Sequence, residues 1–202
     1  PLGLDPRLGR ATPLKAPASR SQPLESPWDD SVIGRRKLWT MADGERRFRI
    51  AHLSDLHCGG PYFEANLLER AISEVNEFEP DVVICSGDLT TFGFKHEYQV
   101  ARSYLERIDC DSFVVVPGNH DARNVGYVHF ENLFGDRNSV LRKDGITVVA
   151  VDSSEPDLDH GQIGRGRYRW IEEQFAQPAD MRVFVLHHHL LPVPGTALGT
   201  TP

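Results

Sequence analysis

The sequence predicts an α/β domain in which short buried strands alternate with amphipathic helices. Residues 81–85 and 112–116 contain the continuous apolar runs Val-Val-Ile-Cys and Phe-Val-Val-Val, which have the composition of strands buried on both faces. Residues 64–78 and 95–108 instead place apolar side chains at helical spacing. This alternation favours a largely parallel central sheet with helices packed against it. At 202 residues the chain is long enough for one such domain.

The remaining elements follow the same logic along the chain. Helices are expected over residues 64–78, 95–108, 127–133 and 166–176. Strands are expected over residues 48–53, 81–85, 112–116, about 139–142, 146–151 and 181–186. Pro80 ends the first helix, because proline has no N–H to continue it. Asp144-Gly145 is typical of a tight hairpin turn, so the fourth and fifth strands should pair with each other.

The first 45 residues have a different composition from the rest. Six of the 14 prolines fall within the first 27 residues, and no apolar periodicity is visible there. Residues 1–45 are therefore expected to be a disordered or extraneous extension outside the fold. Met41 opens the segment that leads into the first expected strand and could be the natural start.

Charge and composition exclude several classes of protein. Residues 1–40 hold seven Lys or Arg against four Asp or Glu, a net of +3, which leaves −10 for the rest of a chain whose total is −7. An acidic body argues against general nucleic-acid binding, which needs a basic face. No apolar run approaches the roughly 20 residues of a membrane span. The N-terminus lacks the apolar core of a secretory signal, so a cytoplasmic location is expected.

The three cysteines do not predict a disulfide framework. Cys58, Cys85 and Cys110 are odd in number and show no Cys-x-x-Cys spacing. Their pattern agrees with a reducing compartment. Cys58 lies beside the first polar motif, so a redox or ligand role competes there with the simpler interpretation of a small packed side chain.

Polar side chains follow four of the expected strands, at the point where each strand ends. They are Asp55 and His57, then Asp88, then Asn119 and His120, and finally His187. Ligands of α/β sheets bind beyond the carboxyl ends of the strands. We therefore expect four neighbouring strands to bring these side chains together, although 31 to 67 residues separate successive groups along the chain.

The residue types in these groups indicate metal ions. Asp and His together suit Mn, Fe, Zn, Co or Ni, whereas Ca and Mg sites consist almost entirely of oxygen ligands. Asp88 follows a glycine and could bridge two cations through its carboxylate oxygens, while Asn119 adds a neutral oxygen donor. Two metals about 3.5–4 Å apart can clamp a phosphate and activate a hydroxide as nucleophile. The pattern predicts a dinuclear centre for phosphoester hydrolysis.

Four segments resemble those of the calcineurin-like metallophosphoesterases. They are His-Leu-Ser-Asp-Leu-His (52–57), Ser-Gly-Asp-Leu-Thr (86–90), Val-Pro-Gly-Asn-His-Asp (116–121) and Leu-His-His-His (186–189). The resemblance runs from about residue 49 to residue 194. It implies a layered β-sheet sandwich flanked by helices, with the domain occupying residues 46–202. Residues 150–154 and 161–175 are similar to the cyclic-nucleotide phosphodiesterase branch.

The resemblance also implies a metal ligand set. Asp55 and His57 would bind the first metal, and Asp88 would bridge both ions. Asn119 and His187 would bind the second metal. Manganese, iron and zinc are the expected ions.

Catalytic and substrate-contacting roles are implied in the same way. His120 would contact the phosphate and protonate the leaving alkoxide, with Asp121 orienting it. Asn119, His120 and His188 are expected to contact substrate, and His189 could also line the pocket. Asp152 could be either structural or an outer partner of the site.

One element of the family pattern is missing. The family closes its site with a later Gly-His-x-His motif that gives one histidine to each metal, and no histidine follows His189. We therefore expect a domain that lacks its C-terminal part. Each metal would lack one ligand, so weak or absent metal binding is expected for the chain as given.

Three functional interpretations remain open from sequence. The first is hydrolysis of phosphomonoesters or phosphodiesters, with 3′,5′-cyclic nucleotides as the leading substrates. The second is a non-catalytic interaction protein of the same fold, and the third is an inactive fragment. The presence of His120, the proton donor, favours the enzyme. Expected partners are a small phosphoester, with no membrane and no general nucleic acid, and the oligomeric state stays open.

Overall fold

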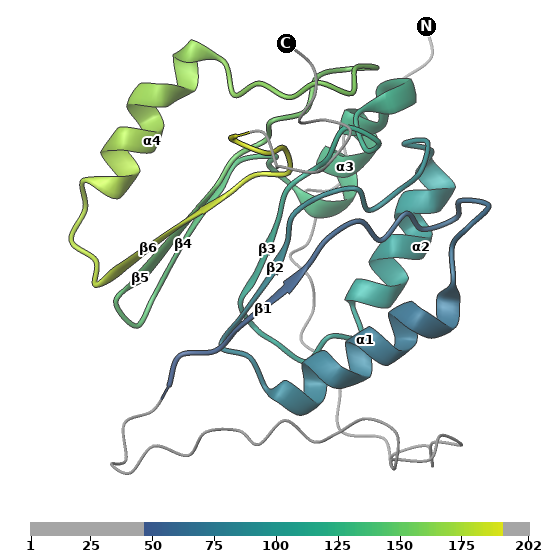
Figure 1. Ribbon diagram of the computed structural model, residues 1–202, viewed down its shortest axis with the longest axis horizontal. Coiled ribbons are helices and arrows are strands. Elements are labelled where there is room, and N and C mark those ends of the chain that lie inside the picture. Colours follow the sequence, from purple (N-terminus) through teal and green to yellow (C-terminus); the bar gives the residue numbers. More distant parts are fainter. Residues whose placement is uncertain (1–46, 192–202) are drawn as a thin grey trace, which may run out of the picture.

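Two three-stranded β-sheets face each other in this protein, and helices cover their outer surfaces (Figure 1). The structure is a computed structural model, and it describes residues 47–191. The extension expected over residues 1–45 lies outside the described residues. The layered β-sandwich expected from the resemblance is confirmed.

The first sheet is entirely parallel. Its strands are β1 (Ile50–Leu53), β2 (Val82–Cys85) and β3 (Phe113–Val115), in the order β1-β2-β3. The helices beside this sheet are α1 (Ala65–Phe78), α2 (Lys95–Leu105) and α3 (Gly126–Phe134). All four residues of β2 are buried, because this central strand has a layer on each face.

The second sheet combines a hairpin with a parallel strand. β4 (Ser139–Lys143) pairs antiparallel with β5 (Ile146–Ala150), and β5 pairs in parallel with β6 (Met181–Val185). The hairpin turn is Asp144-Gly145, as predicted, with both residues at positive φ. Helix α4 (Tyr168–Phe175) lies on the outer side, where Phe175 meets Phe184 with ring centroids 5.9 Å apart.

The expectation that four adjacent strands of one sheet deliver the polar groups is therefore wrong in one respect. β6 belongs to the second sheet, so His187 reaches the site from across the sandwich. The continuous apolar runs of β2 and β3 are buried by this second sheet as well as by helices. The sequence of an apolar run does not show whether a helix or a second sheet buries it.

Alternation along the central strand divides the core into two clusters. Val83 and Cys85 point to one side, where they pack with residues of α1, α2 and α3. Val82 and Ile84 point to the other side and pack between the sheets, against residues such as Val148. The period-2 geometry of a strand separates these neighbours, so one short segment holds three layers together.

Helix ends account for the small differences from the sequence prediction. α2 ends at Leu105 rather than residue 108, since the next turns tighten: Arg107 N–H donates to the carbonyl of Tyr104, and Ile108 N–H to that of Leu105. At its start, the Glu97 carboxylate accepts from the backbone N–H of the N-cap residue Phe94, as the glutamate of a capping box does. A 3₁₀ turn precedes α4.

Burial predicts different reactivities for the three thiols. Cys58 and Cys85 are fully buried, whereas Cys110 is partly exposed. Burial raises the pKa of Cys58 to about 12, so its reactive thiolate is scarce near neutral pH. Iodoacetamide at pH 8 should modify Cys110 first, and Cys58 and Cys85 only after unfolding, as read by mass spectrometry of tryptic peptides. Rapid labelling of Cys58 in the folded protein would restore a redox or ligand role for it.

Candidate metal centre

The segments that follow β1 and β2 are joined by backbone hydrogen bonds. The N–H of Asp55 donates to the carbonyl of Gly87 at 3.0 Å, and the N–H of His57 donates to that of Asp88 at 2.9 Å. The two chain segments thus continue side by side beyond the sheet. This continuation brings the first two predicted groups together.

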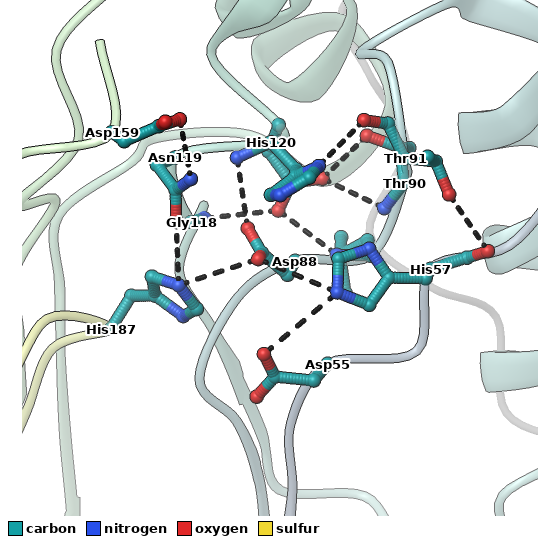
Figure 2. A network of polar contacts seen from close by, with 12 residues as sticks. Asp55, His57, Asp88, Thr90, Thr91, Gly118, Asn119, His120, Asp159 and His187 are labelled. Atoms are coloured by element: carbon teal, nitrogen blue, oxygen red, sulfur yellow. Dashed lines mark hydrogen bonds and ion pairs between the residues drawn. The ribbon is translucent and has the colours of Figure 1, made fainter. Parts of the chain in front are cut away.

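Three of the predicted ligands have a backbone conformation that is unusual for residues other than glycine. Asp55, His57 and Asp88 have φ values of 58°, 46° and 52°. Side chains clash with the following carbonyl in this region, at a cost of roughly 1 kcal/mol or more per residue. Such strain clusters at functional sites, where the surrounding structure enforces it. These turns aim all three side chains at one point (Figure 2).

Two glycines allow the loops to approach closely. A Cβ at Gly118 would lie 2.2 Å from Oδ1 of Asp88, and one at Gly87 would lie 2.6 Å from the nitrogen of Gly118 and 2.9 Å from Nδ1 of His187. No side chain fits at these distances. The glycines in the Gly-Asp and Gly-Asn-His-Asp motifs therefore create the space in which the polar groups converge.

Asp88 lies at the centre of the group (Figure 2). Its side chain is 4 % exposed, and its Oδ2 is 3.6 Å from Nε2 of His57 and 3.5 Å from Nε2 of His187. These separations are long for hydrogen bonds. They match the separation of about 3.4 Å between two ligands that each lie about 2.1 Å from one metal at a tetrahedral angle.

The ring of His187 has one nitrogen committed to the protein. Its Nδ1 donates to the carbonyl of Ser86 at 2.9 Å, across the gap between the sheets. In the neutral imidazole Nε2 then holds a lone pair, and this atom lies 3.1 Å from Oδ1 of Asn119. Because the Asn119 amide donates through Nδ2 to Asp159, its oxygen must face His187. The lone pairs of His187 Nε2 and Asn119 Oδ1 therefore face each other. A cation bound by both atoms would stabilise this arrangement.

His120 is held in the same manner on the opposite side of Asp88. Its backbone N–H donates to Oδ1 of Asp88 at 2.9 Å, and its Nδ1 donates to the carbonyl of Thr91 at 2.7 Å. Its ring meets that of His57 edge to face, with centroids 4.7 Å apart. The remaining nitrogen, Nε2, is the atom available for a ligand or a proton transfer.

The group that contacts the His120 ring is a backbone carbonyl and not Asp121, which was predicted to orient His120. The carbonyl of Thr91 takes that position, and the Asp121 carboxylate accepts from the N–H groups of Leu89, Thr90 and Gly118 and from the Thr90 hydroxyl. Burial raises the pKa of Asp121 to about 6, against the lowering effect of these donors. Asp121 therefore ties the loops after β2 and β3 together, and its orienting effect on His120 stays a prediction.

His188 and His189 were predicted to contact substrate or line the pocket, and these roles stay predictions. His188 turns toward the second sheet, where its Nδ1 lies 2.8 Å from the Ser153 hydroxyl, and burial lowers its pKa. His189 is exposed. Asp152 is structural: its buried carboxylate pairs with Arg137 at 2.7 Å and accepts from Ser154.

Sequence reasoning missed Asp159 and Arg123. Asp159 Oδ1 accepts from Nδ2 of Asn119 at 3.2 Å and from the Arg123 guanidinium at 2.6 Å. The hydrogen bond and charge of Arg123 hold the pKa of Asp159 below its ordinary value. The sequence did indicate a cationic side chain near the site, because Arg123 follows His120-Asp121 by two residues. Nothing in the composition of residues 155–164 indicated that this loop returns to the site.

Two sets of side chains could each hold a metal ion, and both include Asp88. In one, His57, Asp88 and His120 place a ligand atom each within 4.8 Å of the others; in the second, Asp55, Asp88 and His187 do so. The expected pair of Asp55 and His57 falls in the same range, with 3.9 Å between Oδ1 and Nε2. Carboxylates with imidazoles are a donor set that suits transition metals, so the residues present fit such ions.

A cavity of about 770 Å³ opens beside these sets. His57 and His120 are among its polar lining residues, while Leu56, Phe63 and Leu67 contribute to its apolar wall. The cavity has the volume of a site for a small organic ligand.

No helix among residues 47–191 is long and apolar enough to cross a membrane.

Comparison with known proteins agrees with this geometry. The chain is 30 % identical over 129 residues to a probable glycerophosphodiester phosphodiesterase of Arcobacter nitrofigilis, an alignment that covers 60 % of this chain and 47 % of that protein. It is 30 % identical over 162 residues to a probable cyclic nucleotide phosphodiesterase of Rhodococcus erythropolis, covering 71 % of this chain and 52 % of that protein.

A cAMP/cGMP dual specificity phosphodiesterase of Mycobacterium tuberculosis is 26 % identical over 163 residues, which cover 71 % of this chain and 50 % of that protein. The chain thus spans about half the length of these curated relatives. Residues 48–199 match the sequence model described as Calcineurin-like phosphoesterase. With that match spanning most of its length, the chain belongs to the calcineurin-like phosphoesterase family.

Proposed function

We propose that this protein hydrolyses phosphodiesters with a pair of metal ions that share Asp88. The observation that supports this most directly is the position of Asp88 Oδ2, 3.5–3.6 Å from the Nε2 atoms of His57 and His187. Asp55 and His57 would hold one ion, and Asn119 and His187 the other. Manganese, iron and zinc suit this mixture of oxygen and imidazole donors. When bound, such ions neutralise phosphate charge and lower the pKa of water.

The protein's own groups have defined tasks in this proposal. Asp88 holds the backbone N–H of His120, and the Nδ1–H bonds of His120 and His187 fix the two rings before substrate arrives. His120 Nε2, the free nitrogen of a ring that lines the cavity, would donate a proton to the leaving alkoxide. Asn119 and His120 would contact the phosphate oxygens. His188 faces Ser153 and is not assigned to substrate.

The proposed substrates are phosphodiesters with an apolar or aromatic group, and 3′,5′-cyclic nucleotides are the leading candidates. Two relatives are named as cyclic-nucleotide phosphodiesterases and one as a glycerophosphodiester phosphodiesterase. The largely apolar wall of the cavity suits a nucleobase better than a glycerol group. A non-catalytic interaction protein would not require the strained backbone at Asp55, His57 and Asp88.

Hydrolysis of bis-p-nitrophenyl phosphate, by a complete version of the protein that also carries the Gly-His-x-His ligands absent after His189, tests the proposal. Activity should require added Mn²⁺ and should fall to background in Asp88→Ala, which removes the shared ligand. His120→Ala should lower kcat by about 10²–10⁴-fold, the usual contribution of a general acid. His96→Ala, an exposed histidine outside the site, is the matched control and should retain activity. Full activity in Asp88→Ala or His120→Ala would refute the proposed function.

The role proposed for Asp121 predicts a large effect on stability. Asp121→Ala leaves the buried N–H groups of Leu89, Thr90 and Gly118 without their acceptor. The free energy of unfolding should fall by about 3 kcal/mol in urea titrations. Asp136→Ala, at an exposed carboxylate, should change it by less than about 0.5 kcal/mol. A wild-type urea midpoint for Asp121→Ala would show that the carboxylate does not hold these loops together.

The cavity can be tested by a polar substitution that does not disturb the core. Leu67 lines the cavity and is 66 % exposed, so Leu67→Gln should fold normally. If a nucleobase covers this side chain, KM for cyclic AMP should rise about fivefold, the loss of about 1 kcal/mol of apolar contact. Met181→Gln, at an exposed apolar residue on β6, should leave KM unchanged. An unchanged KM in Leu67→Gln would place the organic group elsewhere.

A further inference from the structure

A carboxylate outside the predicted ligand set contacts the site through Asn119. Asp159 lies in the loop between β5 and α4, 40 residues from Asn119 in sequence, and its Oδ1 accepts from Nδ2 of the asparagine at 3.2 Å (Figure 2). The other end of the amide, Oδ1, faces Nε2 of His187 at 3.1 Å. The asparagine is therefore held at its nitrogen by Asp159 while its oxygen points into the proposed metal site.

An asparagine amide can rotate by 180° about its last bond, and the two orientations are nearly equal in shape. Only the orientation with the oxygen inward offers a metal an electron pair. The inverted orientation would aim an N–H₂ group at the cation. It would also bring the carboxylate of Asp159 against the amide oxygen, so two acceptors would collide. The carboxylate thus excludes the inverted amide.

Arg123 fixes the carboxylate in turn. Its guanidinium binds Asp159 Oδ1 at 2.6 Å, and Arg123 follows the Asn119-His120 segment at the start of the short 3₁₀ turn Arg123–Val125. The Asp159 side chain is 73 % exposed, and an ion pair at such a place adds little to stability. The contact is better explained by the geometry that it imposes on Asn119.

A second carboxylate of the same loop provides a natural comparison. Asp157 Oδ1 accepts from the backbone N–H of Asn124 at 2.9 Å, so it docks the loop on the same turn. Its hydrogen bond is to the backbone of Asn124, whereas that of Asp159 is to the side chain of Asn119. The two carboxylates have the same charge, lie two residues apart, and differ in what they touch.

We propose that Asp159 is a positioning residue, which orients the Asn119 amide so that its oxygen faces the metal beside His187, with Arg123 holding the carboxylate in place. The metal-binding part rests on the proposed function. The orientation of the amide does not, because it is a property of the protein without metal. The chemical class of the ligand is a divalent transition-metal ion. The experiment therefore has two readouts.

The first readout is the side-chain amide of Asn119 in ¹⁵N-edited NMR spectra of the metal-free 202-residue chain, assigned by its disappearance in Asn119→Asp. Asp159→Ala should shift this signal pair and speed its exchange with water. Asp157→Ala should leave it in place. Asp159→Asn keeps an acceptor oxygen and should restore the wild-type signals. Identical signals in wild type and Asp159→Ala would overturn the proposal, whatever the protein hydrolyses.

The second readout is Mn²⁺ affinity, measured by paramagnetic broadening of the His187 ring signals, which detects weak binding as well as strong. Asp159→Ala should weaken it about tenfold, as is usual when the partner of a metal ligand is removed. Asp159→Asn and Asp157→Asn remove equal charge and should resemble each other. If Asp157→Ala weakened Mn²⁺ binding as much as Asp159→Ala, docking of the loop would explain both, and the orienting role would be wrong.

Discussion

The burial of Asp88 is the constraint on which the rest of the site depends. A carboxylate that is 4 % exposed needs compensation, since the charge of an ion removed from water is costly without partners. The protein supplies one N–H donor to its Oδ1, from His120, and leaves Oδ2 between two imidazoles at 3.5–3.6 Å. Positive charge at Oδ2 completes this environment, and the residues around it are arranged to receive such charge.

Two sheets are needed because the Asp88 carboxylate has neighbouring ligand side chains on both sides. The parallel sheet places Asp55, His57 and Asp88 on neighbouring turns, but a third wall has to come from elsewhere. β6 provides it, and the bond from His187 Nδ1 to the carbonyl of Ser86 joins the end of the second sheet to the first. The apolar cluster between the sheets, with Val82, Ile84 and Val148 among its members, therefore sets the width of the site.

Much of this could be predicted from sequence, for physical reasons. Periodicity identified the elements because burial imposes period 2 or 3.6 on a chain, and strand ends located the groups of Asp55, Asp88 and Asn119 because parallel strands share one edge. Sequence could not assign β6 to a second sheet, since an apolar run is the same beneath a sheet or a helix. Nor could it give the partner of His120, because a backbone carbonyl such as that of Thr91 leaves no trace in residue identity. Asp159 could not be predicted for a related reason: its contact with Asn119 depends on the path of an irregular loop.

The carboxylates of the site have opposite effects on the stability of the fold. This difference explains how a strained, charged site can persist in a folded protein. The carboxylates of Asp55 and Asp88 repel each other, and both residues have left-handed backbones. Both features destabilise the folded state in the absence of cations. Asp121 works in the opposite sense, with four hydrogen bonds that hold the loops after β2 and β3. Metal ions that bind only the folded protein would add stability by mass action. The hydrogen bonds of Asp121 thus hold one part of the site without metal, and the proposed ions would stabilise the other part.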